Sequence, residues 1–235
     1  MSASVNIVPM ELHGQYPFNP DFSTKIKDLF DLVSPVKTKV HQYESVYAHI
    51  FADKTVTNFL QIGIWGWGFR EKFNSDLTAW ARLFRQANIY GGDKEEIPEQ
   101  QKPFAFPDLN DRIKTCFVDQ EVPASFNALK EAFDVEFDVI IDDASHIYTN
   151  TIITFEALFS VLKDDGVYLI EGIQDAGEGQ FKWQQTLVQL EAYMTAENHT
   201  YKVFQSLPPS EIEDQAGLPQ GTCLMSDSYI LCVYK

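Results

Sequence analysis

The stretch FDVIIDDASHI, residues 137–147, joins a continuous apolar run to two carboxylates and an imidazole. Its first five residues are typical of a strand that is buried on both faces of a parallel sheet. Asp142 and Asp143 follow directly, and His146 comes soon after them. Open α/β sheets bind ligands at the carboxyl ends of their strands, where such groups can hold a metal or accept a proton. Taken alone, the stretch fits equally well an Asp-rich turn that caps the next helix.

Apolar strands alternate with amphipathic helices through most of the chain. Strands are expected at residues 57–64, 88–93, 113–119, 137–143 and 166–173, with helices at 70–85, 123–133 and 149–163. This alternation predicts an α/β fold in which helices cover both faces of a parallel sheet. The link from Asp93 to Ile113 contains Pro98, Pro103 and Pro107, so a regular crossover helix is not expected there.

The N-terminal part of the chain departs from this alternation. Residues 1–20 are interpreted as an arm, and apolar spacing predicts helices at 21–33 and at about 40–51. The expected organisation is therefore an arm with helices, residues 1–52, packed on a single globular domain, residues 53–235.

The C-terminal part departs from it as well. A helix at about 182–196 precedes two strands, at 200–205 and 228–235, which are expected to form an antiparallel hairpin. The acidic, Pro-containing loop at 207–221 joins them. Loops of this length are often functional, so this one is a candidate substrate lid.

Composition limits the classes of partner. The 235 residues, of which 45% are hydrophobic, suffice for one well-buried domain. The net charge of -16, from 34 acids and 18 bases, disfavours a nucleic-acid partner. No apolar run approaches the ~20 residues that span a bilayer, and the first ten residues do not resemble a secretory signal. Three cysteines without metal-ligand spacing favour a location in the reducing cytoplasm. The sequence leaves open whether the chain forms a homo-oligomer.

Glycines mark the first strand-to-helix turn. The sequence QIGIWGWGFR, residues 61–70, places Gly63, Gly66 and Gly68 where the backbone can approach a bound cofactor. The spacing differs from the G-x-G-x-x-G of dinucleotide enzymes, and a purely structural turn is the alternative. Asp93 ends the next strand, where an acid commonly binds both hydroxyls of a cofactor ribose.

Polar residues also end the other expected strands. Asp119 and Gln120 follow the third strand, and Glu171 lies at the end of the fifth. The carboxyl ends of parallel strands meet at one edge of a sheet, so this distribution favours an enzyme that uses a cofactor.

Three stretches resemble a known family: HQYESVYAHIF (41–51), FVDQEVPASFNAL (117–129) and IDDASHIYTNTIITFEALFSVLKDDGVYLIEGI (141–173). With the glycine turn and the acids at the strand ends, the chain resembles the class I S-adenosylmethionine-dependent methyltransferases. Within that class it is similar to the metal-dependent sugar O-methyltransferases of macrolide biosynthesis, the mycinamicin type, over roughly residues 37–175. The resemblance implies a Rossmann-like fold, with a mostly parallel seven-stranded sheet and a C-terminal antiparallel hairpin.

The resemblance also implies roles for individual residues. The residue that matches Asp143 binds magnesium, and the one that matches His146 is the general base. Asp93 would bind the ribose of S-adenosylmethionine, and the pair Asp119 and Gln120 would lie near its adenine.

Two positions depart from the family pattern. Gln61 stands where an acid usually precedes the first glycine, and Gly172 replaces the second acid of a pair that ends the fifth strand. Glu171, the remaining acid of that pair, is the expected second metal ligand. Side chains alternate along a strand, so Asp142 is expected to face the cofactor, and Asp143 the metal. We therefore expect weak, substrate-assisted binding of Mg²⁺.

The expected reaction is O-methyl transfer from S-adenosylmethionine to a hydroxyl of a small molecule, a sugar or glycosylated metabolite of natural product biosynthesis. His146 would remove the hydroxyl proton, and Mg²⁺ would orient the hydroxyl and lower its pKa. One alternative is a binding or partner protein that kept the fold and lost catalysis, which Gln61 and Gly172 favour. The other is a nicotinamide enzyme, which the glycine spacing and the late hairpin oppose.

Overall fold

The computed structural model describes residues 7–9, 20–33, 37–38, 41–64, 75–95, 111–173, 185–205 and 229–235. The strands are β1 (Ile7–Pro9), β2 (Asn58–Ile62), β3 (Asn88–Asp93), β4 (Ile113–Phe117), β5 (Phe137–Asp142), β6 (Leu162–Ile173), β7 (Thr200–Gln205) and β8 (Tyr229–Tyr234). The helices are α1 (Pro20–Val33), α2 (Glu44–Phe51), α3 (Ser75–Leu83), α4 (Pro123–Phe133), α5 (Tyr148–Leu158) and α6 (Leu187–Ala196).

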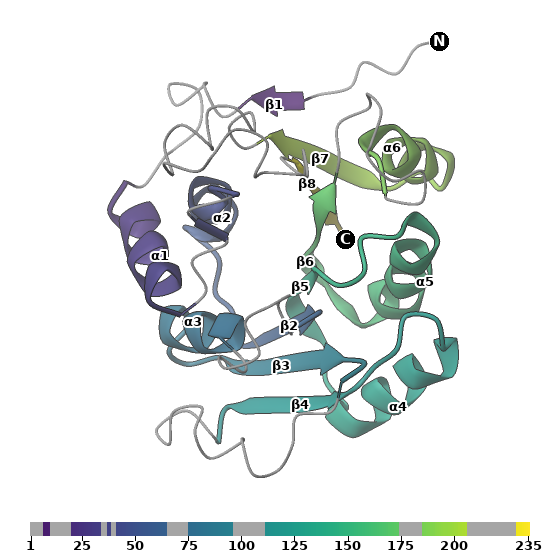
Figure 1. The fold of residues 1–235 in the computed structure, drawn as a ribbon, viewed down its shortest axis with the longest axis horizontal. Coiled ribbons are helices and arrows are strands. Elements are labelled where there is room, and N and C mark those ends of the chain that lie inside the picture. The colour runs from purple at the N-terminus through teal and green to yellow at the C-terminus, as the bar shows by residue number, and fades with distance from the viewer. Residues whose placement is uncertain are drawn as a thin grey trace.

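The eight strands of the described residues form one sheet, in the order β1-β7-β8-β6-β5-β2-β3-β4 (Figure 1). Strands β4, β3, β2, β5 and β6 are parallel neighbours. Strand β8 lies between β6 and β7 and is antiparallel to both. The expected fold class is confirmed: β2 to β8 make a mostly parallel sheet that ends in an antiparallel hairpin.

Strand β1 extends this sheet by an eighth strand. It pairs in parallel with β7 at the edge, through Ile7 and Val203, Val8 and Phe204, and Pro9 and Gln205. The interpretation of residues 1–20 as an arm did not include this strand, because three residues are too few to show an alternating pattern.

Strand β6 begins earlier than the sequence pattern indicates. The expected helix at 149–163 ends at Leu158, and a 3₁₀ turn at Phe159–Val161 leads into β6. Phe137 of β5 pairs with Leu162, whereas Val139 pairs with Val167, so β6 carries extra residues in a bulge. Such a bulge keeps both ends of the strand in register with its neighbour.

Helices cover both faces of the sheet (Figure 1). Helices α1, α2 and α3 lie on one side, and α4, α5 and α6 lie on the other. On the first side, the buried indole of Trp80 contacts the rings of Phe30 of α1, Tyr47 of α2 and Phe59 of β2, at centroid distances of 4.7, 5.0 and 4.8 Å. Aromatic pairs contribute about 0.5–1.5 kcal/mol each beyond their buried area. The N-terminal helices therefore share a core with the sheet.

Several expected features lie outside the described residues. They are Gly66 and Gly68 of the glycine turn, and the candidate lid at 207–221. Across the parts of the chain that the structure does describe, none of the helices combines the length and the apolar character needed to cross a membrane. Cys116 and Cys232 are free thiols.

Candidate active site

Gly63 follows β2 at the carboxyl edge of the sheet. Its φ of 81° is a left-handed conformation, and its N–H donates to the Gly92 carbonyl over 2.9 Å. A Cβ at this position would lie 2.2 Å from the backbone oxygen of Asp143. Only glycine lets the turn after β2 pack directly on the backbone that follows β5.

Asp93 ends β3, beside this turn. Its Oδ2 accepts a hydrogen bond from the N–H of Ile64 over 2.9 Å, and its Oδ1 accepts one from the N–H of Glu95 over 3.1 Å. An ionised carboxylate has about four lone-pair sites, so it can accept further hydrogen bonds. The structure thus places Asp93 next to the glycine turn, as the sequence predicts.

Gln61 connects the glycine turn to neighbouring side chains by hydrogen bonds. Its Nε2 donates to the Gly63 carbonyl over 2.8 Å and to Asp76 Oδ2 over 3.1 Å. Its Oε1 accepts from the indole N–H of Trp80 over 2.8 Å. The side chain is wholly buried. Gln61 therefore joins the glycine turn to the core.

Gln120 connects three elements at the same edge. Its Nε2 donates to Asp142 Oδ1 over 3.1 Å and to Thr154 Oγ1 over 2.8 Å, and its Oε1 accepts from the Ser145 N–H over 3.0 Å. Burial raises the pKa of Asp142 to about 8, although hydrogen bonds from the Ala144 N–H and from Gln120 act in the opposite direction. The negative charges of Asp143 and Glu171 raise this pKa further.

Asp119 shapes the turn that precedes α4. Its Oδ1 accepts from the N–H of Glu121 over 2.9 Å, and its own N–H donates to Ser125 Oγ over 3.1 Å. The side chain is half-buried at the end of β4. These contacts give Asp119 a structural role in addition to the cofactor role expected for it.

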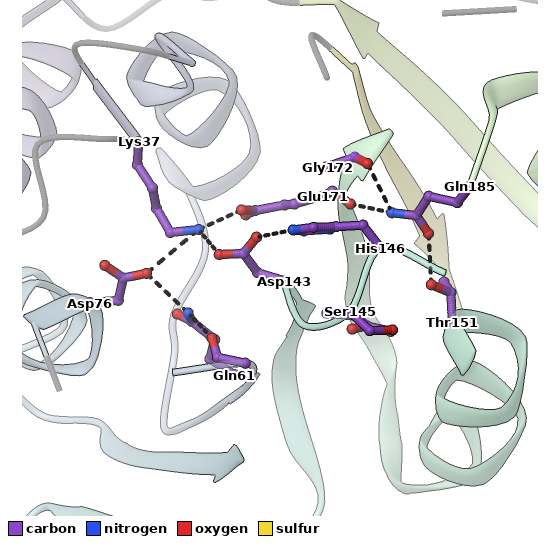
Figure 2. A network of polar contacts seen from close by, with 12 residues as sticks. Lys37, Gln61, Asp76, Asp143, Ser145, His146, Thr151, Glu171, Gly172 and Gln185 are labelled. Atoms are coloured by element: carbon purple, nitrogen blue, oxygen red, sulfur yellow. Dashed lines mark hydrogen bonds and ion pairs between the residues drawn. The ribbon is translucent and has the colours of Figure 1, made fainter. Parts of the chain in front are cut away.

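Asp143 stands between a lysine and His146 (Figure 2). The Nζ of Lys37 donates to Asp143 Oδ2 over 2.7 Å and to Glu171 Oε2 over 2.5 Å, and it lies 3.6 Å from Asp76 Oδ2. On its other side, Asp143 Oδ1 lies 3.7 Å from His146 Nε2. A continuous row of charged or ionisable groups therefore crosses the ends of β5 and β6, in the order Glu171, Lys37, Asp143 and His146.

The groups at one end of this row are deeply buried. The Lys37 side chain is 5% exposed and that of Glu171 is 0% exposed. Burial acts to lower the pKa of Lys37, but Asp143, Glu171 and Asp76 outweigh it and raise this pKa well above the usual value. Burial raises the pKa of Glu171 to about 7, against the opposing effects of Lys37 and of the Tyr47 hydroxyl, which donates to Glu171 Oε1 over 2.6 Å. Lys37 is therefore charged and is held by carboxylates.

His146 has an uncommon backbone conformation for a non-glycine residue, with a φ of 55°. Its Nδ1 is buried, and no hydrogen-bond partner for this atom occurs within the described residues. The ring packs against Gly172, where a Cβ would lie 2.1 Å from Nδ1. The imidazole is 25% exposed, so Nε2 is the nitrogen that an incoming hydroxyl could reach.

Gln185, which precedes α6, holds this part of the edge together. Its N–H donates to the His146 carbonyl over 2.9 Å. Its Nε2 donates to the backbone oxygens of Glu171 and Gly172 over 2.5 and 3.2 Å, and its Oε1 accepts from Thr151 Oγ1 over 2.7 Å (Figure 2). Gln185 thus joins the loop after β5 and helix α5 to the end of β6.

Comparison with known proteins identifies sequence relatives. No protein-family model matches the chain. It is 32% identical over 141 residues to 8-demethyl-8-alpha-L-rhamnosyl tetracenomycin-C 2'-O-methyltransferase of Streptomyces olivaceus, a match that covers 59% of this chain and 35% of the relative. It is 28% identical over 142 residues to mycinamicin VI 2''-O-methyltransferase of Micromonospora griseorubida, with 58% and 33% covered. The matches thus span only about a third of the length of these relatives.

Solved structures show the same architecture. The methyltransferase MycE of the mycinamycin biosynthetic pathway, in complex with Mg, SAH and mycinamycin VI, superposes with a TM-score of 0.64 at 22% identity, over 90% of this chain and 54% of MycE. The chain has the class I methyltransferase fold and resembles sugar O-methyltransferases in sequence. An O-methyltransferase from Bacillus cereus in complex with SAH matches with a TM-score of 0.54 at 15% identity, over 90% of this chain and 91% of that one. The SAH and Mg of the MycE complex agree with the two cofactors expected from the sequence.

The acids of this methyltransferase fold do not form a complete metal site. Mg²⁺ prefers six oxygen ligands in near-octahedral geometry. Asp143 and Glu171 converge as expected, but they converge on the ammonium group of Lys37. Within the described part of the chain, no group of three or more His, Cys, Asp or Glu residues could hold a metal ion. The side chains as arranged do not fit a resident divalent cation.

Sequence reasoning did not identify four residues of this edge: Lys37, Tyr47, Asp76 and Gln185. Lys37 is separated from Asp143 by 106 positions and from Glu171 by 134. Nothing in its local sequence marks it, because the apolar periodicity that predicts helices and strands carries no information about distant ion pairs. The tyrosines around 41–51 did contribute to the family resemblance, and Tyr47 is one of them.

Proposed function

We propose that this chain transfers a methyl group from S-adenosylmethionine to a hydroxyl of a small molecule, a sugar or glycosylated metabolite. The observation that carries the proposal is the Asp143–His146 pair, which lies at the same sheet edge as the Gly63 turn and the Asp93 carboxylate. The named activities of the sequence relatives support the class of acceptor.

Cofactor binding would use the glycine turn and the strand ends beside it. The close backbone approach at Gly63 and the carboxylate of Asp93 suit a nucleoside with a ribose to bind. Gln120 and Asp142 would line the neighbouring strand ends, where their mutual hydrogen bond holds both side chains in place. When bound, the cofactor supplies an electrophilic methyl carbon.

His146 would remove the proton from the acceptor hydroxyl. Methyl transfer requires the acceptor oxygen to be aligned with the methyl carbon and to lose its proton. Nε2 would accept this proton, and Asp143 Oδ1, 3.7 Å away, would stabilise the imidazolium that forms. Lys37 and Gly172 fix the two members of this pair from opposite sides.

The test compares His146→Asn with His199→Asn. His199 packs against Phe155 and Phe159 and serves as a matched control for the loss of an imidazole. We expect His146→Asn to lower kcat by about 10²–10⁴-fold, with the SAH affinity nearly unchanged, because positioned proton transfer is worth that much. His199→Asn should keep kcat. A His146→Asn variant that turns over normally would remove His146 from the mechanism.

A second candidate is a protein that binds S-adenosyl compounds without catalysis. The ion pairs of Lys37 with both expected metal ligands favour it, because they leave these carboxylates neutralised. Assays with methyl-labelled S-adenosylmethionine and a panel of glycosides distinguish the two candidates: SAH binding without any methylated product supports the second. The cytoplasmic location, the lack of nucleic-acid and membrane partners and the oligomeric state stay predictions.

A further inference from the structure

We propose that the ammonium group of Lys37 takes the place of a divalent cation between Asp143 and Glu171, so that this chain holds such an ion weakly at most. The inference deepens the proposed function and rests on it in one respect, namely that this sheet edge is the catalytic site.

The geometry around Lys37 Nζ resembles the surroundings of a bound cation. Two carboxylate oxygens lie at 2.7 and 2.5 Å, from Asp143 and Glu171, and a third, from Asp76, lies at 3.6 Å. The three acids come from β6, α3 and the loop after β5, and Lys37 lies before α2. Buried carboxylates need a positive partner, and here the chain itself supplies it.

A lysine and a metal ion cannot share these oxygens. Mg²⁺ binds oxygen ligands at about 2.0–2.1 Å, so an ion held by Asp143 and Glu171 would approach the same atoms to which Nζ donates. Two positive charges repel strongly where one of them, like the Lys37 ammonium, is buried. Metal binding therefore requires Lys37 to leave both carboxylates.

Gly172 provides an independent observation. A side chain here would have supplied another ligand at the end of β6, but the imidazole of His146 occupies the space where its Cβ would stand. The site thus lacks one potential metal ligand, at Gly172, and already holds a fixed cation, the Lys37 ammonium group. Both features weaken the binding of a metal ion.

Lys37 would act on the reaction through Asp143, as a positioning residue. Its hydrogen bond to Oδ2 turns Oδ1 toward His146 Nε2. A single positive charge behind Asp143 thereby orients the carboxylate that would stabilise the protonated imidazole, which is a task that a metal ion could otherwise perform.

The test is a titration of the cofactor-free protein with Mn²⁺, followed by electron paramagnetic resonance and by calorimetry. We expect no binding to the wild type at micromolar Mn²⁺. Lys37→Ala should bind Mn²⁺ at least about tenfold more tightly than the wild type, because it opens the carboxylates and removes the competing charge.

Lys163→Ala is the matched control. Lys163 donates to Asp138 over 2.7 Å near the start of β5, so this variant also frees a carboxylate and removes one positive charge. It should leave Mn²⁺ binding as in the wild type. Lys37→Gln replaces the alanine variant if that variant does not fold, because its amide still donates hydrogen bonds to the carboxylates. It should also bind Mn²⁺ more tightly than the wild type.

Micromolar binding of Mn²⁺ by the wild type would overturn the inference, and so would an unchanged Mn²⁺ affinity in the folded Lys37 variants. The titration uses neither cofactor nor acceptor, so its result is independent of turnover. SAH binding by the same preparation tests the proposed function separately. Where turnover is measured, wild-type kcat should resist EDTA, and the kcat of Lys37→Gln should depend on added Mg²⁺.

Discussion

Replacement of Gly172 by alanine is expected to displace His146 and to stop methyl transfer. The new Cβ would lie 2.1 Å from Nδ1, 2.3 Å from Cε1 and 2.7 Å from Cγ of the imidazole, so the ring has to move. The φ of 64° adds a left-handed strain of roughly 1–2 kcal/mol for a residue with a side chain. Overpacking of a filled site costs typically about 1–3 kcal/mol more.

The assays separate stability, cofactor binding and chemistry. Urea unfolding should show a loss of about 2–5 kcal/mol in the free energy of unfolding. The kcat should fall by about 10²-fold or more, because a displacement of about 1 Å costs that much. Calorimetry should find nearly unchanged SAH affinity, since Gly63 and Asp93 are untouched.

A double variant isolates the contact between the two residues. With His146→Ala in the background, the added Cβ has room, and Gly172→Ala should then cost only the strain of about 1–2 kcal/mol. An unchanged urea midpoint together with an unchanged kcat in Gly172→Ala would show that the alanine does not displace His146. The same conclusion would follow if the costs of the two substitutions simply add.

Two further predictions concern charged groups elsewhere in the sheet. Asp93→Ala should weaken SAH binding by about ten- to hundred-fold, the effect of losing charge-assisted hydrogen bonds, and unchanged affinity in calorimetry would argue against the ribose assignment. The pKa of Asp138 is lowered, because hydrogen bonds from Lys163 and from nearby backbone and hydroxyl groups outweigh the opposing effect of burial. Its contribution to stability is present above the unfolded pKa of about 3.9 and is lost as the pH falls through the lower folded value. Asp138→Asn should therefore have a lower free energy of unfolding than the wild type at neutral pH. As the pH falls below about 4, the variant should lose less of this free energy than the wild type. Parallel profiles of the free energy of unfolding against pH, measured with urea, would contradict the prediction.

Local patterns in the sequence are enough to predict the class of fold and the edge at which the functional groups gather. Buried strands need apolar residues on both faces, and the helices between them need one apolar side, so local periodicity predicts both. Because parallel strands all end at the same edge, the polar residues that follow them are predicted to meet. Gly63, Asp93, Asp143 and Glu171 do lie along the ends of β2, β3, β5 and β6.

The contacts that these groups make could not be predicted from local patterns and are seen in the folded chain alone. The acids expected to converge on a metal converge on Lys37, which is more than a hundred positions away in the chain. At Gly172 the ring of His146 leaves no room for the side chain of an acid. The amide of Gln61 is used in hydrogen bonds to Trp80 and to the glycine turn. Such contacts depend on packing between distant segments, and no periodicity in the sequence records them.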